Sequence, residues 1–185
     1  MAGRFRIFGA ELSPYSVKVR AYFRFKQIPH QWIIRSTDTM DDFAKFAKLP
    51  IIPLVVSPQL QGAQDSTLII QHLESEHQID SIYPQDTTVN FVSTLLEEFG
   101  DEWGNKWMFH YRWARDIDQL ASARRIAQLT QPDANAEQLD QLTEQVRLRM
   151  TGRVWFVGSN PETTPQIEAS LHLALKQLEV HLESR

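Results

Sequence analysis

The sequence predicts two structural units in series, an α/β unit over residues 1–86 and an all-helical unit over 87–185. In the first part, short runs rich in β-branched and aromatic residues alternate with helical segments. In the second part, apolar residues recur at three- and four-residue steps, which is the spacing of one helix face. Tyr83-Pro84 interrupts the pattern between them, and we place the domain boundary there.

The α/β unit is expected to open as strand, helix, strand. The apolar run 5–9 ends at a glycine and predicts the first strand. Ser13 before Pro14 predicts a helix start, because serine is a favoured N-cap and proline a favoured first helical residue. This helix should run to about Lys26, and the β-branched and aromatic content of 30–34 predicts the second strand.

The same unit is expected to close with a hairpin and a third helix. Residues 51–56 read as a third strand, and the turn at 57–58 leads into a short fourth strand at 60–63. Asp65-Ser66 then stands where an acidic or hydroxyl residue would cap a helix.

Three apolar stripes predict long helices in the second unit. The first contains Val92, Leu95, Leu96, Phe99, Trp103, Trp107 and Tyr111. The others contain Leu139, Leu142, Val146 and Met150, and, after a Thr164-Pro165 start, Leu171, Leu175, Leu178 and Leu182. The polar stretch 130–138 predicts a loop, and the run 154–157 is the strongest strand-like segment after Thr87.

Composition excludes several classes of function. A net charge of −4 and a pI near 5.9 disfavour a nucleic-acid-binding surface. With no cysteine, disulfides, thiolate metal sites and a nucleophilic cysteine are excluded. The six histidines lack metal-ligand spacing, and no phosphate loop or serine-hydrolase elbow is present. Without a signal-peptide core or a membrane-length apolar run, the expected location is the cytoplasm.

The element order and three local motifs resemble the glutathione transferase family. The segment 13–20 is similar to the catalytic segment of the serine-type classes, Ile52-Pro53 matches the family's cis-proline position, and Asp65-Ser66 matches its acidic-serine pair. The resemblance implies a thioredoxin-like N-terminal domain followed by a helical glutathione-transferase C-terminal domain. Relatives usually continue past the position of Arg185, so it also implies a shortened or incompletely observed chain.

The resemblance implies a catalytic role for Ser13. Its hydroxyl would donate a hydrogen bond to the sulfur of glutathione, and the positive end of the helix dipole would favour the same thiolate. The alternative is that Ser13 acts only as an N-cap.

The resemblance also assigns glutathione-binding residues. The main chain of Ile52, before a cis Pro53, would pair with the peptide backbone of glutathione. Asp65 and Ser66 would hold its γ-glutamyl end, and Lys48 its glycyl carboxylate. Each assignment has a structural alternative, namely a trans proline, a plain capping pair and a solvated lysine.

A second-substrate pocket is expected from the resemblance and from the density of aromatic residues. Its predicted residues are Tyr15, Trp103, Trp107, His110 and Tyr111. The alternative is that part of this stripe is helix-helix core, and that His110 is a packing residue with its polar atoms satisfied.

The resulting hypothesis is a detoxifying enzyme that conjugates glutathione, its co-substrate, to a hydrophobic electrophilic small molecule. Family habit adds a homodimer and no metal, nucleic-acid or membrane partner. The alternative is a non-catalytic binding or interaction protein with the same fold. Glutathione-dependent reduction is disfavoured, because that chemistry normally uses a cysteine where this chain has Ser13.

Overall fold

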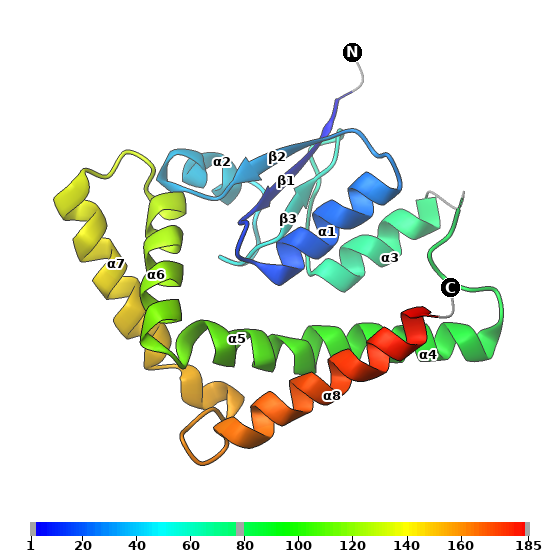
Figure 1. The fold of residues 1–185 in the computed structure, drawn as a ribbon. Helices are drawn as coiled ribbons and strands as arrows, with labels where there is room; N and C mark the ends of the chain where they lie inside the picture. Colours follow the sequence, from blue (N-terminus) through cyan, green and yellow to red (C-terminus); the bar gives the residue numbers. More distant parts are fainter. Residues whose placement is uncertain (1–2, 77–79, 184–185) are drawn as a thin grey trace. The chain divides into compact units, whose positions relative to one another are not determined.

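The computed structural model describes residues 3–76 and 80–183, and the chain divides into two compact units (Figure 1). The first comprises Met1–Ser93 with Gln128–Ala134, and the second comprises Thr94–Ala127 with Asn135–Arg185. None of the described helices is long and apolar enough to cross a membrane.

Within residues 3–76, the first unit contains a four-stranded sheet in the order β2-β1-β3-β4. β1 (Phe5–Gly9) runs parallel to β2 (His30–Ile34) and antiparallel to β3 (Leu54–Val56), which pairs antiparallel with β4 (Gly62–Gln64). This is the thioredoxin-like arrangement that the sequence predicted.

The hairpin strands start later than expected. β3 begins at Leu54 and not at residue 51, since Pro53 has no N–H to donate to a strand ladder. Leu60 has φ 63°, a left-handed turn conformation, so β4 begins after it. The expected bounds 51–56 and 60–63 are therefore corrected to these shorter strands.

Helices cover both faces of the sheet (Figure 1). α1 (Pro14–Phe25) and α3 (Ser66–Glu76) confirm the two predicted helices of this unit. A short turn, η1 (Thr37–Thr39), and α2 (Met40–Ala44) were not predicted.

The core of the first unit consists of two apolar clusters on opposite sheet faces, because successive strand residues point in opposite directions. Ile7 on β1 packs with Val19 and Phe23 of α1 and with side chains of α3. Its neighbour Phe8 packs with Phe43 of α2. The side chains of Ile7, Phe8, Val19 and Phe23 are fully buried.

A buried ion pair ties α1 to α3 and to the segment that follows. Lys26 Nζ lies 2.6 Å from Glu74 Oε1, and both side chains are 4% exposed. Tyr22 Oη also donates to Oε1 (2.8 Å), while Ser81 Oγ and the Ile82 N–H donate to Oε2 (2.9 and 3.3 Å). Burial opposes ionisation, but these donors outweigh it and hold the pKa of the Glu74 carboxyl below its usual range.

The described remainder of the chain is helical. Its elements are α4 (Thr87–Glu98), the π-helical η2 (Phe99–Gly104), α5 (Asn105–Trp113), α6 (Asp116–Thr130), α7 (Ala136–Thr151), the 3-10 turn η3 (Val154–Val157) and α8 (Thr164–Glu183). The first three follow one another without a break. The three predicted stripes lie on α4 to α5, on α7 and on α8, as expected, and the loop expected at 130–138 is shorter.

One expectation for the helical unit was wrong, and one of its helices was not identified individually. The strand-like run 154–157 forms η3, closed by hydrogen bonds from Phe156 N–H to the Arg153 carbonyl and from Gly158 N–H to the Trp155 carbonyl. Its side chains remain largely exposed, and no described strand pairs with it. Helix α6 was missed, since its fully buried apolar residues are only Ala123 and Ala127 among those described.

Candidate functional site

Ser13 caps the N-terminus of α1. Its Oγ accepts a hydrogen bond from the Ser16 N–H (3.2 Å), and its own N–H donates to the Ala10 carbonyl (3.1 Å) in a tight turn. The residue is half-buried. A serine hydroxyl accepts and donates at the same time, so the capping contact leaves its proton available to another acceptor.

The two residues near Ser13 on α1 differ in accessibility. Tyr15 is half-buried. Ser16 is fully buried, and a Cβ at Gly9 would lie 2.9 Å from the Ser16 Cβ and 2.5 Å from the Trp32 ring. The Ser16 side chain is therefore enclosed in a tightly packed interior.

The turn before Ser13 is fixed by Glu11. Its two carboxylate oxygens accept from the two terminal nitrogens of Arg20 (2.7 and 2.8 Å), and Oε1 also accepts from Trp32 Nε1 (3.0 Å). The Arg20 guanidinium stacks 4.2 Å from the Trp32 ring centre. The hydrogen bond from Arg20 holds the pKa of the Glu11 carboxyl below its usual range.

The Ile52-Pro53 peptide bond is cis, as expected. Gln64 holds the segment before it at four points. Gln64 Oε1 accepts from the N–H groups of Lys48 and Leu49 (2.8 and 3.0 Å), and Nε2 donates to the carbonyls of Leu49 and Ile51 (2.8 and 2.7 Å). Pro53 is buried, Ile52 is half-buried and the Lys48 side chain is exposed.

Asp65 caps α3 from a strained conformation. Its φ is 78°, and its Oδ1 accepts from the N–H groups of Thr67 and Leu68 (3.0 and 3.2 Å). Asp65 is exposed, whereas Ser66 is 6% exposed. Lys18 Nζ donates to Thr67 Oγ1 (3.3 Å) and so joins α1 to the first turn of α3.

Strand register brings these segments to one end of the sheet. Phe8 lies opposite Leu54, and Leu54 lies opposite Gln64. The chain therefore leaves β1 toward Ser13, enters β3 from Ile52-Pro53 and leaves β4 toward Asp65 at the same edge. This edge carries two helix N-termini, which favour anions.

The predicted aromatic residues of the helical unit fall into two groups. Trp103 and Trp107 line a pocket of about 250 Å³, and His110 and Tyr111 are not among its lining residues. The other lining residues are Lys106, Val157, Gly158, Thr163, Gln166, Ile167 and Ser170. Trp107 is 9% exposed and donates from Nε1 to Ser170 Oγ (2.7 Å), while Trp103 is 47% exposed.

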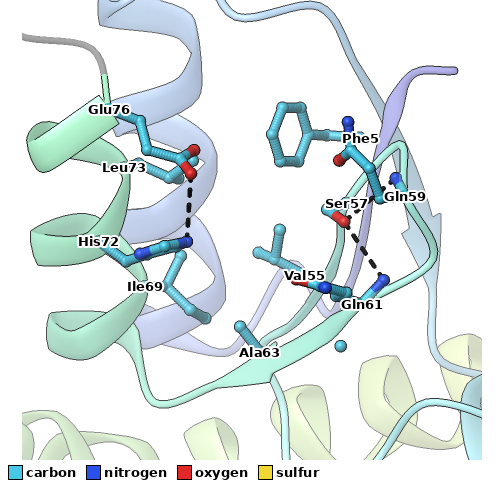
Figure 2. Close-up of a pocket in the computed structure, with 11 residues that line it drawn as sticks. Phe5, Val55, Ser57, Gln59, Gln61, Ala63, Ile69, His72, Leu73 and Glu76 are labelled. Atoms are coloured by element: carbon cyan, nitrogen blue, oxygen red, sulfur yellow. Dashed lines mark hydrogen bonds and ion pairs between the residues drawn. The ribbon is translucent and has the colours of Figure 1, made fainter. Parts of the chain in front are cut away.

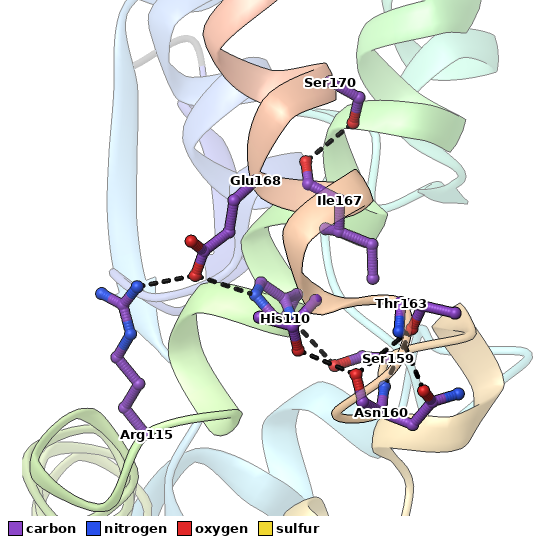
Figure 3. A network of polar contacts seen from close by, with 9 residues as sticks. His110, Arg115, Ser159, Asn160, Thr163, Ile167, Glu168 and Ser170 are labelled. Atoms are coloured by element: carbon purple, nitrogen blue, oxygen red, sulfur yellow. Dashed lines mark hydrogen bonds and ion pairs between the residues drawn. The ribbon is translucent and has the colours of Figure 1, made fainter.

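His110 belongs to a polar network that joins α5 to α8 and to the segment before it (Figure 3). Its Nδ1 lies 2.7 Å from Ser159 Oγ, and its Nε2 lies 3.6 Å from Glu168 Oε1. Arg115 donates to the same Glu168 oxygen at 2.6 Å. His110 is 1% exposed, so its ring is enclosed within the unit.

A smaller pocket of about 110 Å³ lies between α3 and the β3–β4 hairpin (Figure 2). Its floor is apolar, and the rim carries His72 and Glu76, whose Nε2 and Oε1 lie 3.6 Å apart. Ser57 Oγ accepts from the Gln59 and Gln61 N–H groups (3.2 Å each) and closes the turn. No predicted site residue lines this pocket.

No group of three or more His, Asp or Glu side chains in residues 3–76 and 80–183 is arranged to hold a metal ion. Comparison with protein families gives one decisive match: residues 7–81 fit the family "Glutathione S-transferase, N-terminal domain". Residues 7–81 therefore resemble the N-terminal domain of glutathione S-transferases. A comparison with proteins of curated function gives no significant match.

Solved structures with the glutathione S-transferase fold agree. The β-etherase LigF from Sphingobium sp. strain SYK-6 is 18% identical, with a TM-score of 0.65 over 99% of this chain and 74% of that one. A Methylobacterium radiotolerans glutathione S-transferase in complex with glutathione sulfonate is 19% identical, with a TM-score of 0.53 over 80% of this chain. A Rhodospirillum rubrum F11 glutathione S-transferase is 16% identical, with a TM-score of 0.52 over 89% of this chain and 84% of that one. Such low identities show the fold alone.

The chain is shorter than some of these structures. It spans 63% of the length of the Methylobacterium radiotolerans protein and 66% of a glutathione S-transferase from Methylobacillus flagellatus.

Sequence reasoning missed two kinds of residue in this glutathione S-transferase fold. Gln64 bonds residues at least 13 positions away in the sequence, and Glu11 bonds residues at least 9 positions away. No local motif reveals such contacts. Lys106 lies between Trp103 and Trp107 in the sequence. Its position within the aromatic stripe was the signal that could have placed a cation in the pocket.

Proposed function

We propose that this chain binds glutathione at the sheet edge of its first unit and transfers the glutathione thiolate to an electrophilic small molecule. The observation that carries the proposal is the N-cap position of Ser13 at that edge, in a domain of the glutathione S-transferase family. Its hydroxyl would donate to the sulfur, since the capping bond uses only an acceptor site of Oγ.

The other binding groups follow from the same edge. The main chain of Ile52 would pair with the peptide part of glutathione, and the first turn of α3, with Asp65 and Ser66, would receive the γ-glutamyl end. Gln64 supports this role indirectly, because its four hydrogen bonds fix the segment from Lys48 to Ile51. Lys48 would reach the glycyl carboxylate from an exposed position.

For the second substrate, we retain the predicted residues Tyr15, Trp103, Trp107, His110 and Tyr111. Trp103 and Trp107 carry this part of the proposal, since they line a pocket of about 250 Å³. A detoxifying role in the cytoplasm as a homodimer completes the proposal. Light scattering of the purified chain tests the dimer.

The decisive experiment compares Ser13→Ala with Ser16→Ala. Both remove one hydroxyl at the start of α1, but the Ser16 side chain is fully buried whereas Ser13 is half-buried. We expect Ser13→Ala to lower turnover with an aryl halide by about 10²-fold or more, the range for losing a hydrogen bond to developing charge. Glutathione binding, measured by calorimetry, should change little.

Thiolate absorbance of the glutathione complex provides the second readout. In the parent, the bound thiol should ionise at lower pH than free glutathione, and Ser13→Ala should bring its pKa back toward the free value. Equal turnover in parent and Ser13→Ala would remove the catalytic role of Ser13.

One observation favours a second candidate function. The Ser13 hydroxyl already has a structural task as the N-cap of α1, which a non-catalytic glutathione-binding or interaction protein would also need. Glutathione binding with an unshifted thiol pKa and no turnover across a panel of electrophiles would identify this alternative.

A further inference from the structure

The pocket of the helical unit combines flat apolar walls with one cation. Trp103 and Trp107 supply two indole rings, and Val157 and Ile167 add aliphatic surface. Its volume of about 250 Å³ exceeds the roughly 150 Å³ of an engineered cavity that binds benzene. The pocket therefore has room for one substituted aromatic group.

Most polar groups of its walls are already paired within the unit. The Trp107 indole N–H donates to Ser170 Oγ (2.7 Å), and that hydroxyl donates to the Ile167 carbonyl (2.7 Å). Thr163 Oγ1 donates to the Gly158 carbonyl (2.6 Å). Figure 3 shows Ser170, Ile167 and Thr163 on the same stretch of chain, which His110 anchors through Ser159. The walls are thus held in place before a ligand arrives.

Lys106 and Gln166 are the exceptions among the lining side chains, and Lys106 carries a charge. Its Nζ lies 4.4 Å from the centre of the Trp103 ring, and no described carboxylate forms an ion pair with it. None of the residues that line the pocket is acidic. The pocket therefore holds an uncompensated positive charge beside an aromatic surface.

This combination selects a ligand by charge and shape. A carboxylate would pair with the Lys106 ammonium by a charge-assisted hydrogen bond, and an attached ring would pack against the indoles. A cationic aromatic molecule would be repelled. A neutral one would gain apolar burial alone.

We propose that this pocket binds aromatic carboxylates, with Lys106 as the residue that recognises the anion. If the ligand is the second substrate, the proposal rests on the proposed function and names the class of electrophile. The binding itself does not depend on that function, because the ligand contacts the helical unit without glutathione.

The test uses 2-naphthoate and its neutral methyl ester as probes, titrated into the full chain without glutathione and followed by tryptophan fluorescence. Lys106→Gln should weaken 2-naphthoate binding at least tenfold and leave the ester within twofold. Trp103→Ala should weaken both probes. Lys176→Gln, an exposed lysine of α8 outside the pocket, is the matched control and should change neither.

Three outcomes would overturn the inference: no binding of 2-naphthoate to the parent, equal affinities for both probes, or the same loss in Lys106→Gln and Lys176→Gln. Urea midpoints of all variants verify that folding is retained. Because glutathione is absent, inactivity in the Ser13 experiment leaves this result unaffected. Conversely, loss of the naphthoate site would leave the role of Ser13 standing.

Discussion

The two units of this chain are held together differently. In the first, strand residues such as Ile7 and Phe8 are fully buried beneath helices on both sheet faces. In the helical unit, only four apolar residues among those described are buried: Trp107, Trp113, Ala123 and Ala127. Its helices are joined instead by polar contacts, including Trp107 to Ser170 and His110 to Ser159. The fold of the first unit is therefore stabilised mainly by buried apolar side chains, and the fold of the helical unit relies more on a few side-chain hydrogen bonds.

The largest expected effect comes from removing volume in the first unit. Phe23→Ala should lower the free energy of unfolding by about 3–5 kcal/mol, since it empties a fully buried site between β1 and α1. Phe25→Ala is the matched control on the same helix, because Phe25 is 64% exposed. It should change stability by about 0.5 kcal/mol or less. Urea unfolding followed by circular dichroism measures both, and similar losses would contradict the apolar-core interpretation.

The buried ion pair between Lys26 and Glu74 tests whether a polar contact also contributes to the stability of the first unit. Glu74→Gln should cost about 3 kcal/mol, because it removes the carboxylate that pairs with the buried Lys26 ammonium, which also donates to the Asp80 carbonyl (2.8 Å). Urea midpoints at neutral pH measure this loss. An unchanged midpoint would mean that the Glu74 charge contributes nothing measurable to the stability of the fold.

The pH dependence of this variant has a defined sign. The pKa of Glu74 is lowered in the folded chain, so its ionised form stabilises the fold above its unfolded pKa of about 4.3. The contribution is lost as pH falls from there through the folded pKa. The difference between parent and Glu74→Gln should therefore be constant near neutral pH and shrink below about pH 4.

A smaller effect on stability is expected from the hydrogen bond between His110 and Ser159 in the helical unit. Ser159→Ala should cost about 1–2 kcal/mol, because it leaves the buried Nδ1 of His110 without its partner. Tryptophan fluorescence during urea unfolding is a suitable probe, since four of the five tryptophans lie after residue 100. Ser75→Ala, at an exposed serine of α3, is the control. A loss no larger than that of the control would show that His110 is held by packing alone.

Much of the fold followed from local sequence patterns. Ser13-Pro14 marked the start of α1, and the alternation of apolar runs marked β1 and β2, because these signals are short-range. Helix α6 escaped detection since its buried face is made of Ala123 and Ala127, while the larger Ile117 is 78% exposed. The apolar period that identifies a helix was therefore carried by small residues.

The strand-like pattern at 154–157 was misleading for the opposite reason. Its β-branched and aromatic residues favour a strand, but strand formation requires a partner, and the described sheet lies in the other unit. Tertiary context thus overrode local propensity.

The candidate site residues remain predictions from motifs. Ser13, Ile52-Pro53 and Asp65 were recognised from motifs, and the strand register brings their segments to one sheet edge. The residues that position them were not. Glu11 and Gln64 act across the fold, so their roles appear only when the strands are paired.

The four hydrogen bonds of the Gln64 side chain have an evolutionary consequence. One carboxamide donates two hydrogen bonds and accepts two, which a carboxylate of the same length cannot do. The identity of residue 64 and the length of the segment 48–51 are therefore constrained by each other. In a lineage of such sequences, an insertion in that segment and a replacement of the amide should be inherited together, as a correlated pair of changes.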